Sequence, residues 1–214
     1  MRKVLFMKGS ELRLIEYMEG SKKRFIIPVY QRNYDWKIEN CKQLYDDLIQ
    51  VIKNNSKTHF FGSIVSVYEP SGRNTEFLII DGQQRLTTMS LLFLAMYNLL
   101  EEKIIISEDE SLKDQIYEDF LVDKYQPQEK RMKLKPIKND QKAFSKLFNS
   151  KDDYIKDSNL TINYSYFYER IQKQEITIDE LFDAICRLEI INITLNNEDN
   201  PQLIFESLNS TGLD

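Results

Sequence analysis

The polar segment DGQQR, residues 81–85, has the residue types of an anion-binding site. It follows an apolar, β-branched run at 78–80 and precedes residues 86–100, which are apolar at helical spacing. The segment should therefore lie where a strand ends and a helix begins. The first N–H groups of a helix have no partner within the helix and form the positive end of its dipole, so this position attracts anions.

Each side chain of this segment suggests a role. Gly82 has no Cβ and lets a bound group approach the backbone. Arg85 offers a fork of donors that matches phosphate oxygens. Gln83 and Gln84 are suited to hold a nucleotide or an attacking water, because an amide both donates and accepts. Asp81 would repel a bare phosphate, so a functional Asp81 implies Mg²⁺, an oriented water or a ribose hydroxyl between them.

The same segment also has a purely structural explanation. In that explanation Asp81 caps the helix, Gln84 completes a capping box, and Arg85 is a solvated residue of the first turn. The five residues alone favour neither explanation.

Aromatic and polar residues alternate in a second segment, residues 27–36, "IPVYQRNYDW". Such a combination is typical of surfaces that stack on bases or anchor partners. The structural alternative is a small core at a junction between strand and helix, which would include Trp36 and Tyr34. The better candidates for a functional contact of this kind are Tyr30, Gln31 and Arg32.

Two further segments carry possible contacts to a ligand. Residues 204–214, "IFESLNSTGLD", end in more polar residues than a helix stop requires, and such a loop can close over a ligand. Residues 124–138 contain six Lys or Arg and one Glu. This basic stretch is either a solvated strand and turn or a rim that faces phosphate.

Composition limits the classes of protein to which the chain can belong. It has 214 residues, 42% of them hydrophobic and 29% charged, which indicates one packed soluble domain or a core with a helical subdomain. The net charge of −5 argues against nucleic-acid binding through an overall positive field. The single histidine weakens histidine metal sites, and the two cysteines, which lack CxxC spacing, suggest neither a disulfide framework nor a zinc knuckle. No window approaches a membrane span, and we expect a cytoplasmic protein.

Strands and helices do not alternate regularly, which indicates an α+β fold rather than a doubly wound sheet. Strands are expected at 24–30, 131–136 and 189–195, and a hairpin at 60–69 and 76–80 with a loop longer than two residues. Helices are expected at 10–20, 38–55, 83–100, 112–122, from 139 or 140, and at 162–171, 177–188 and 202–208.

Several segments together resemble the N-terminal domain of GmrSD-type modification-dependent restriction endonucleases and the related SspE-like anti-phage proteins. The resemblance rests on residues 27–36, 60–65 with "LIIDGQQRLTT" at 78–88, and "NPQLIFESLNSTGLD" at 200–214, in that order and at about that spacing. Residues 133–140, "KLKPIKND", and 164–171, "YSYFYERI", also look like family segments. The resemblance covers essentially the whole chain.

The resemblance implies a ParB/sulfiredoxin-like α+β core with a small mixed sheet, in one domain (1–214) enlarged by a mainly helical insertion at about 101–185. In this family DGQQR is associated with binding and hydrolysis of nucleoside triphosphates. The implied catalytic residues are Asp81, Gln83, Gln84 and Arg85, with Asp81 as a ligand of Mg²⁺. The implied nucleotide contacts are Gly82, Arg85, Thr87 and Asn209. The region of Tyr30 and Gln31 is linked in related proteins to sensing modified DNA, and we group Arg32 with it.

The expected partners follow from the same resemblance. They are a nucleoside triphosphate (GTP, ATP, CTP or UTP), modified DNA, and a nuclease domain in a missing C-terminal part or on a partner chain. Because family members usually continue into an HNH-type nuclease, we expect this chain to be a truncated form. Two alternatives stay open, namely a DNA-binding module that grips backbone phosphate without nucleotide turnover and a purely structural assembly domain. Sulfiredoxin chemistry is disfavoured because the turn at 81–85 has no cysteine.

Overall fold

A single mixed sheet forms the upper layer of the computed structural model, which describes residues 8–72 and 74–195. Its order is β1-β6-β3-β4-β2-β5, and β5 lies at one edge. Neighbours are antiparallel in β1/β6 and β3/β4, and parallel in β6/β3, β4/β2 and β2/β5. The strands are β1 (Lys8–Arg13), β2 (Lys23–Ile26), β3 (His59–Ser71), β4 (Asn74–Asp81), β5 (Leu134–Lys135) and β6 (Leu188–Leu195).

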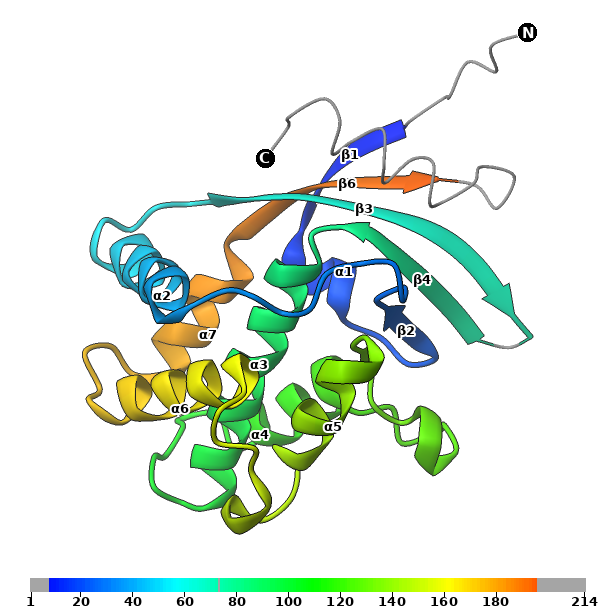
Figure 1. Cartoon of the computed structure of the whole chain (residues 1–214). Coiled ribbons are helices and arrows are strands. Elements are labelled where there is room, and N and C mark those ends of the chain that lie inside the picture. Colours follow the sequence, from blue (N-terminus) through cyan, green and yellow to red (C-terminus); the bar gives the residue numbers. More distant parts are fainter. Residues whose placement is uncertain (1–7, 73, 196–214) are drawn as a thin grey trace, which may run out of the picture.

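The helices gather beneath the sheet in Figure 1. They are α1 (Leu14–Met18), α2 (Ile38–Lys53), α3 (Gln83–Glu101), α4 (Leu112–Gln115), α5 (Lys138–Lys146), α6 (Asn159–Gln172) and α7 (Ile178–Cys186). A π-helix continues α4 over Ile116–Leu121, and short 3₁₀ turns occur at Gln128–Lys130 and Lys151–Asp153. None of the helices within 8–72 and 74–195 is long and apolar enough to cross a membrane.

Helix α3 is the centre of the core. Its residues from Leu86 to Met96 are buried on every side, because the helix packs against α4, α6 and the π-helix and shares one hydrophobic core with Ile64 and Ile79 of the sheet. The two faces of the sheet differ, since side chains alternate along a strand. Ile64 and Ile79 join the main core under the sheet, whereas Val65 and Ile80 belong to a smaller cluster on the other face. The rigid α3 therefore starts beside β3 and β4 and fixes the position of residues 81–85.

The α+β expectation is confirmed, and so are most of the longer elements. The helix expected from residue 38 is α2, the helix after Gly82 is α3, and the strand expected at 189–195 is β6. A capping box between Thr177 and Glu180 opens α7, with the Glu180 N–H donating to Thr177 Oγ1 at 3.1 Å.

Three local expectations were wrong. Residues 10–13 belong to β1 rather than to a helix, because they pair with β6. The hairpin strands extend to Ser71 and from Asn74, so only two positions connect them. The helix expected to open at 139 or 140 begins at Lys138. The helix expected at 202–208 lies outside the described residues.

The basic stretch 124–138 contains one buried lysine, which gives a pH-dependent prediction. Lys133 is 1% exposed and its Nζ donates to the carbonyl of Asp119. Burial lowers the pKa of Lys133 to about 8, although the Asp119 and Asp123 carboxylates oppose the shift. Between that value and its ordinary pKa of 10.5, the folded protein binds fewer protons than the unfolded chain, so stability should rise with pH.

We expect this rise to disappear in Lys133→Met. Between pH 7.5 and pH 9.5, the free energy of unfolding in urea should rise by about 1–2 kcal/mol more in wild type than in the variant. Because tyrosines that titrate at high pH are common to both proteins, the difference isolates Lys133. An identical pH response in wild type and variant would contradict the assignment.

Candidate functional site

The DGQQR segment joins β4 to α3. Asp81 is the last residue of β4 and is exposed, and α3 begins at Gln83. The N-cap is Gly82, with φ of 91° and no side-chain cap. The structural explanation from the sequence, an Asp81 cap with a Gln84 capping box, is therefore wrong.

Gly82 is required by packing as well as by its backbone conformation. A Cβ at this position would lie 3.0 Å from the carbonyl oxygen of Ser63 and 3.0 Å from Cγ1 of Ile64. The positive φ is also unfavourable for any residue with a side chain. On this side the turn packs tightly against β3, so a ligand has to approach residues 81–85 from another direction.

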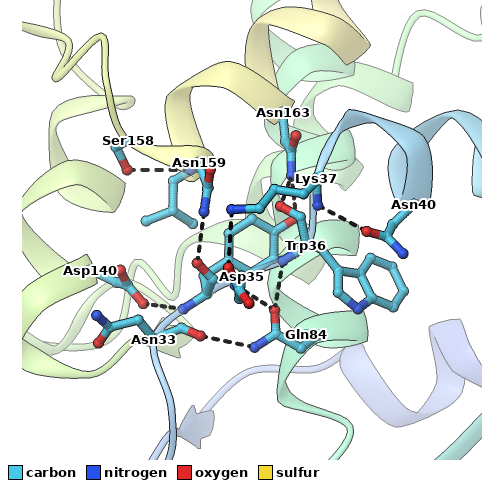
Figure 2. Close-up of polar contacts among 12 residues, drawn as sticks. Asn33, Asp35, Trp36, Lys37, Asn40, Gln84, Asp140, Ser158, Asn159 and Asn163 are labelled. Carbon is cyan, nitrogen blue, oxygen red and sulfur yellow. Dashed lines mark hydrogen bonds and ion pairs between the residues drawn. The ribbon is translucent and has the colours of Figure 1, made fainter.

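The Gln84 side chain holds the loop of residues 33–36, as Figure 2 shows. Its Oε1 accepts from the N–H groups of Asp35 and Trp36 at 2.9 and 3.2 Å. Its Nε2 donates to the carbonyl of Asn33 at 3.1 Å. Gln84 is only 7% exposed. The amide thus connects the start of α3 to a loop about 50 residues earlier in the chain.

Tyr34 anchors the same loop through its backbone N–H and its hydroxyl. Its N–H donates to Asp140 Oδ2 at 2.6 Å, and its hydroxyl pairs with Thr88 Oγ1 at 2.7 Å. Asn163 Nδ2 donates to the Tyr34 hydroxyl at 2.9 Å and to the Trp36 carbonyl at 2.8 Å. Burial raises the pKa values of both Tyr34 and Asp140. Loop, α3, α5 and α6 therefore meet in one hydrogen-bonded network.

The three DNA candidates, residues 30–32, precede this loop directly and occupy different environments. Gln31 is buried and its Nε2 donates to the carbonyl of Ile80, the residue just before Asp81, at 2.7 Å. Tyr30 is half-buried, and burial together with the Glu69 carboxylate raises its pKa. Arg32 is exposed. Gln31 ties this loop to the end of β4, while Arg32 is accessible to a partner.

Gln83 faces a small hollow between the loop and α3. The hollow is lined by Arg32, Tyr34, Gln84, Thr87 and Asp140 among others, and its volume is about 10 Å³. This is room for about one water molecule. Gln83 is 7% exposed, and its Oε1 has no hydrogen-bond partner among the residues that the structure describes. A buried acceptor of this kind is costly unless something donates to it.

Arg85 lies over a bulge in β3. The pairing of β3 with β6 is irregular between Phe60 and Gly62, and Gly62 has φ of +125°. A Cβ at Gly62 would lie 2.5 Å from Arg85 Nε, so only glycine leaves space for the guanidinium. Arg85 Nη1 donates to the Ser63 carbonyl at 3.2 Å. Within the described part of the chain no carboxylate forms an ion pair with this half-buried Arg85, whose other donors can serve a ligand.

The structure thus brings most of the candidate residues together around the start of α3. Asn209 lies outside the described residues. Sequence reasoning missed Asp140, Asn163 and Thr88, although Asp140 and Thr88 lie in segments that supported the family resemblance. No cluster of three or more His, Cys, Asp or Glu that could hold a metal occurs in residues 8–72 and 74–195. A cation at Asp81 would therefore need oxygens from its ligand or from water.

Comparison with protein families places the chain in a known class. Residues 14–214 match the family model described as the N-terminal domain of the GmrSD restriction endonuclease. Because the match spans almost the whole sequence, the chain belongs to this family, as the sequence resemblance predicted. It therefore has a role in a restriction system. A search of curated proteins finds no match.

Proposed function

We propose that this domain binds and hydrolyses a nucleoside triphosphate at residues 81–85 and couples nucleotide state to recognition of modified DNA. The nuclease that cuts the DNA would lie on another part of the protein or on a partner chain. The observation that carries the proposal is the position of Arg85, a cation without an ion-pair partner in the described residues, beside the start of a 19-residue helix. Helix N–H groups and a guanidinium together suit phosphate oxygens.

The geometry supports a division of roles among the side chains. The hollow beside Gln83 is too small for a nucleotide, so the triphosphate would bind on the side where Asp81 is exposed. Asp81 would hold Mg²⁺ together with phosphate and water oxygens. Gln83 Oε1 is buried without a hydrogen-bond partner in the described part of the chain, which suits it to orient a water better than Gln84, whose amide is occupied by the loop.

The coupling to DNA rests on the shared loop. Gln84 and Gln31 connect residues 31–36 to the end of β4 and the start of α3. Arg32 lies in that segment, Tyr30 precedes it directly, and both would contact DNA. Any displacement of the loop changes bonds made by the DGQQR segment, and any displacement of that segment changes bonds made by the loop.

Phosphate release is the measurement that tests this function. We expect the chain to hydrolyse at least one of GTP, ATP, CTP and UTP in Mg²⁺, at a rate that modified DNA changes, and to stop when EDTA removes Mg²⁺. DNA binding with a steep salt dependence and no phosphate release would instead favour a DNA-binding module that grips backbone phosphate. If neither phosphate release nor DNA binding is found, the remaining explanation is a purely structural assembly domain.

A further inference from the structure

We propose that Lys135, Lys138, Lys142 and Lys146 form a binding surface for the phosphate backbone of duplex DNA, called the basic ridge below. The inference rests on the proposed function, because it names the surface that holds the DNA next to the sensing loop. Residues 130–146 contain seven Lys or Arg and one acid. The net charge of the whole chain, −5, conceals this local excess.

The fold arranges three of these lysines along one line. Lys138, Lys142 and Lys146 recur every four residues of α5, so they lie on one helix face about 6 Å apart along the axis. The opposite face of α5 buries Ala143 and Phe144. Lys135 precedes the helix on β5, the strand at the edge of the sheet.

The charges of the ridge are not neutralised by the described part of the protein. None of the four side chains forms an ion pair or a hydrogen bond with a described residue, whereas lysines elsewhere, such as Lys113 and Lys124, pair with glutamates. The single acid of the segment, Asp140, is half-buried and accepts from the Tyr34 N–H instead. Lys133 is buried and does not belong to the surface.

The ridge is continuous with the loop that carries the DNA candidates. The N–H of Ile27 donates to the Lys135 carbonyl at 3.0 Å, and Arg32 lines the same hollow as Ile137 and Asp140. A duplex held at the start of the ridge, by Lys135 and Lys138, would therefore lie near Arg32. Since lysines without an ion-pair partner in the described residues recognise charge without reading bases, the ridge would position DNA and the loop would sense its modification.

The test is the salt dependence of binding to a labelled duplex between 50 and 200 mM KCl. In Lys135→Gln/Lys138→Gln/Lys142→Gln the slope of log affinity against log salt should fall by roughly 2–3, because about 0.9 is lost for each phosphate contact. Affinity at 50 mM KCl should fall at least tenfold. The preference for modified over unmodified duplex should stay unchanged.

A charge-matched control is Lys53→Gln/Lys57→Gln/Lys173→Gln, which changes exposed lysines on other elements. An unchanged slope in the ridge variant, or an equal loss in this control, would overturn the inference. Equal competition by poly-glutamate would assign the ridge to an acidic protein rather than to DNA.

Calorimetric titration of the same variants with triphosphate separates the ridge proposal from the proposed nucleotide site. The ridge variant should keep wild-type nucleotide affinity whether or not it binds DNA.

Discussion

Replacing Arg85 by alanine is expected to reduce triphosphate affinity at least 100-fold while the protein stays folded. The guanidinium would supply charge-assisted hydrogen bonds to phosphate, and losing them costs on the order of 3 kcal/mol of binding free energy. The cost to folding is small, because Arg85 gives up one bond to a backbone carbonyl, that of Ser63. Isothermal titration with a nonhydrolysable triphosphate and Mg²⁺ measures the effect.

Arg187→Ala is the matched control for this experiment. Arg187 is also half-buried and also donates from Nη1 to a backbone carbonyl, that of Ser56, at 3.0 Å. It lies after α7, away from the DGQQR segment in sequence. Wild-type affinity in folded Arg85→Ala would rule out the proposed nucleotide site, and an equal loss in Arg187→Ala would show that the effect is not local.

The second large effect is expected at Gln84. Gln84→Leu removes three hydrogen bonds to the loop and leaves the Asp35 and Trp36 N–H groups without their acceptor. We expect a loss of roughly 2–4 kcal/mol in the free energy of unfolding. Gln84→Glu keeps the acceptor for both N–H groups but loses the bond to Asn33, so its loss should be smaller. Urea unfolding of the three proteins gives the comparison.

The control is the same substitution, glutamine to leucine, at an exposed position. Gln43 Nε2 donates to Asp47 Oδ1 at 2.8 Å on the surface of α2, and Gln43→Leu should change stability by less than about 0.5 kcal/mol. If Gln84→Leu were no more destabilised than Gln43→Leu, the loop would not depend on Gln84. DNA affinity of Gln84→Leu should fall as well, because the loop that carries Tyr30 and Arg32 loses its support.

The sequence was sufficient to place the DGQQR segment between a strand and a helix, but not to reveal the contacts of that segment. The long apolar pattern from Leu86 to Met96 predicts α3 because that helix is buried throughout, and the position of DGQQR follows from it. Residues 10–13 were misassigned because the helical spacing there is local, whereas the pairing with β6 joins residues about 180 positions apart. Tertiary pairing outweighs local periodicity in such a segment.

The role of Gln84 could not be predicted for the same reason. A glutamine in a first helical turn usually suggests capping. Its actual partners, in residues 33–36, are defined only when the chain folds back on itself. Asp140 and Asn163 join that network from segments more than 100 residues away from Tyr34, and no spacing rule links them.

The single amide of Gln84 has a thermodynamic consequence for the whole domain. Because the same side chain belongs to the helix start and bonds to the loop, a ligand bound at the helix start would, on the proposed function, change the free energy of DNA binding at the loop. Equilibrium linkage then requires symmetry: if a triphosphate strengthens attachment to foreign DNA by some factor, that DNA must strengthen retention of the triphosphate by the same factor.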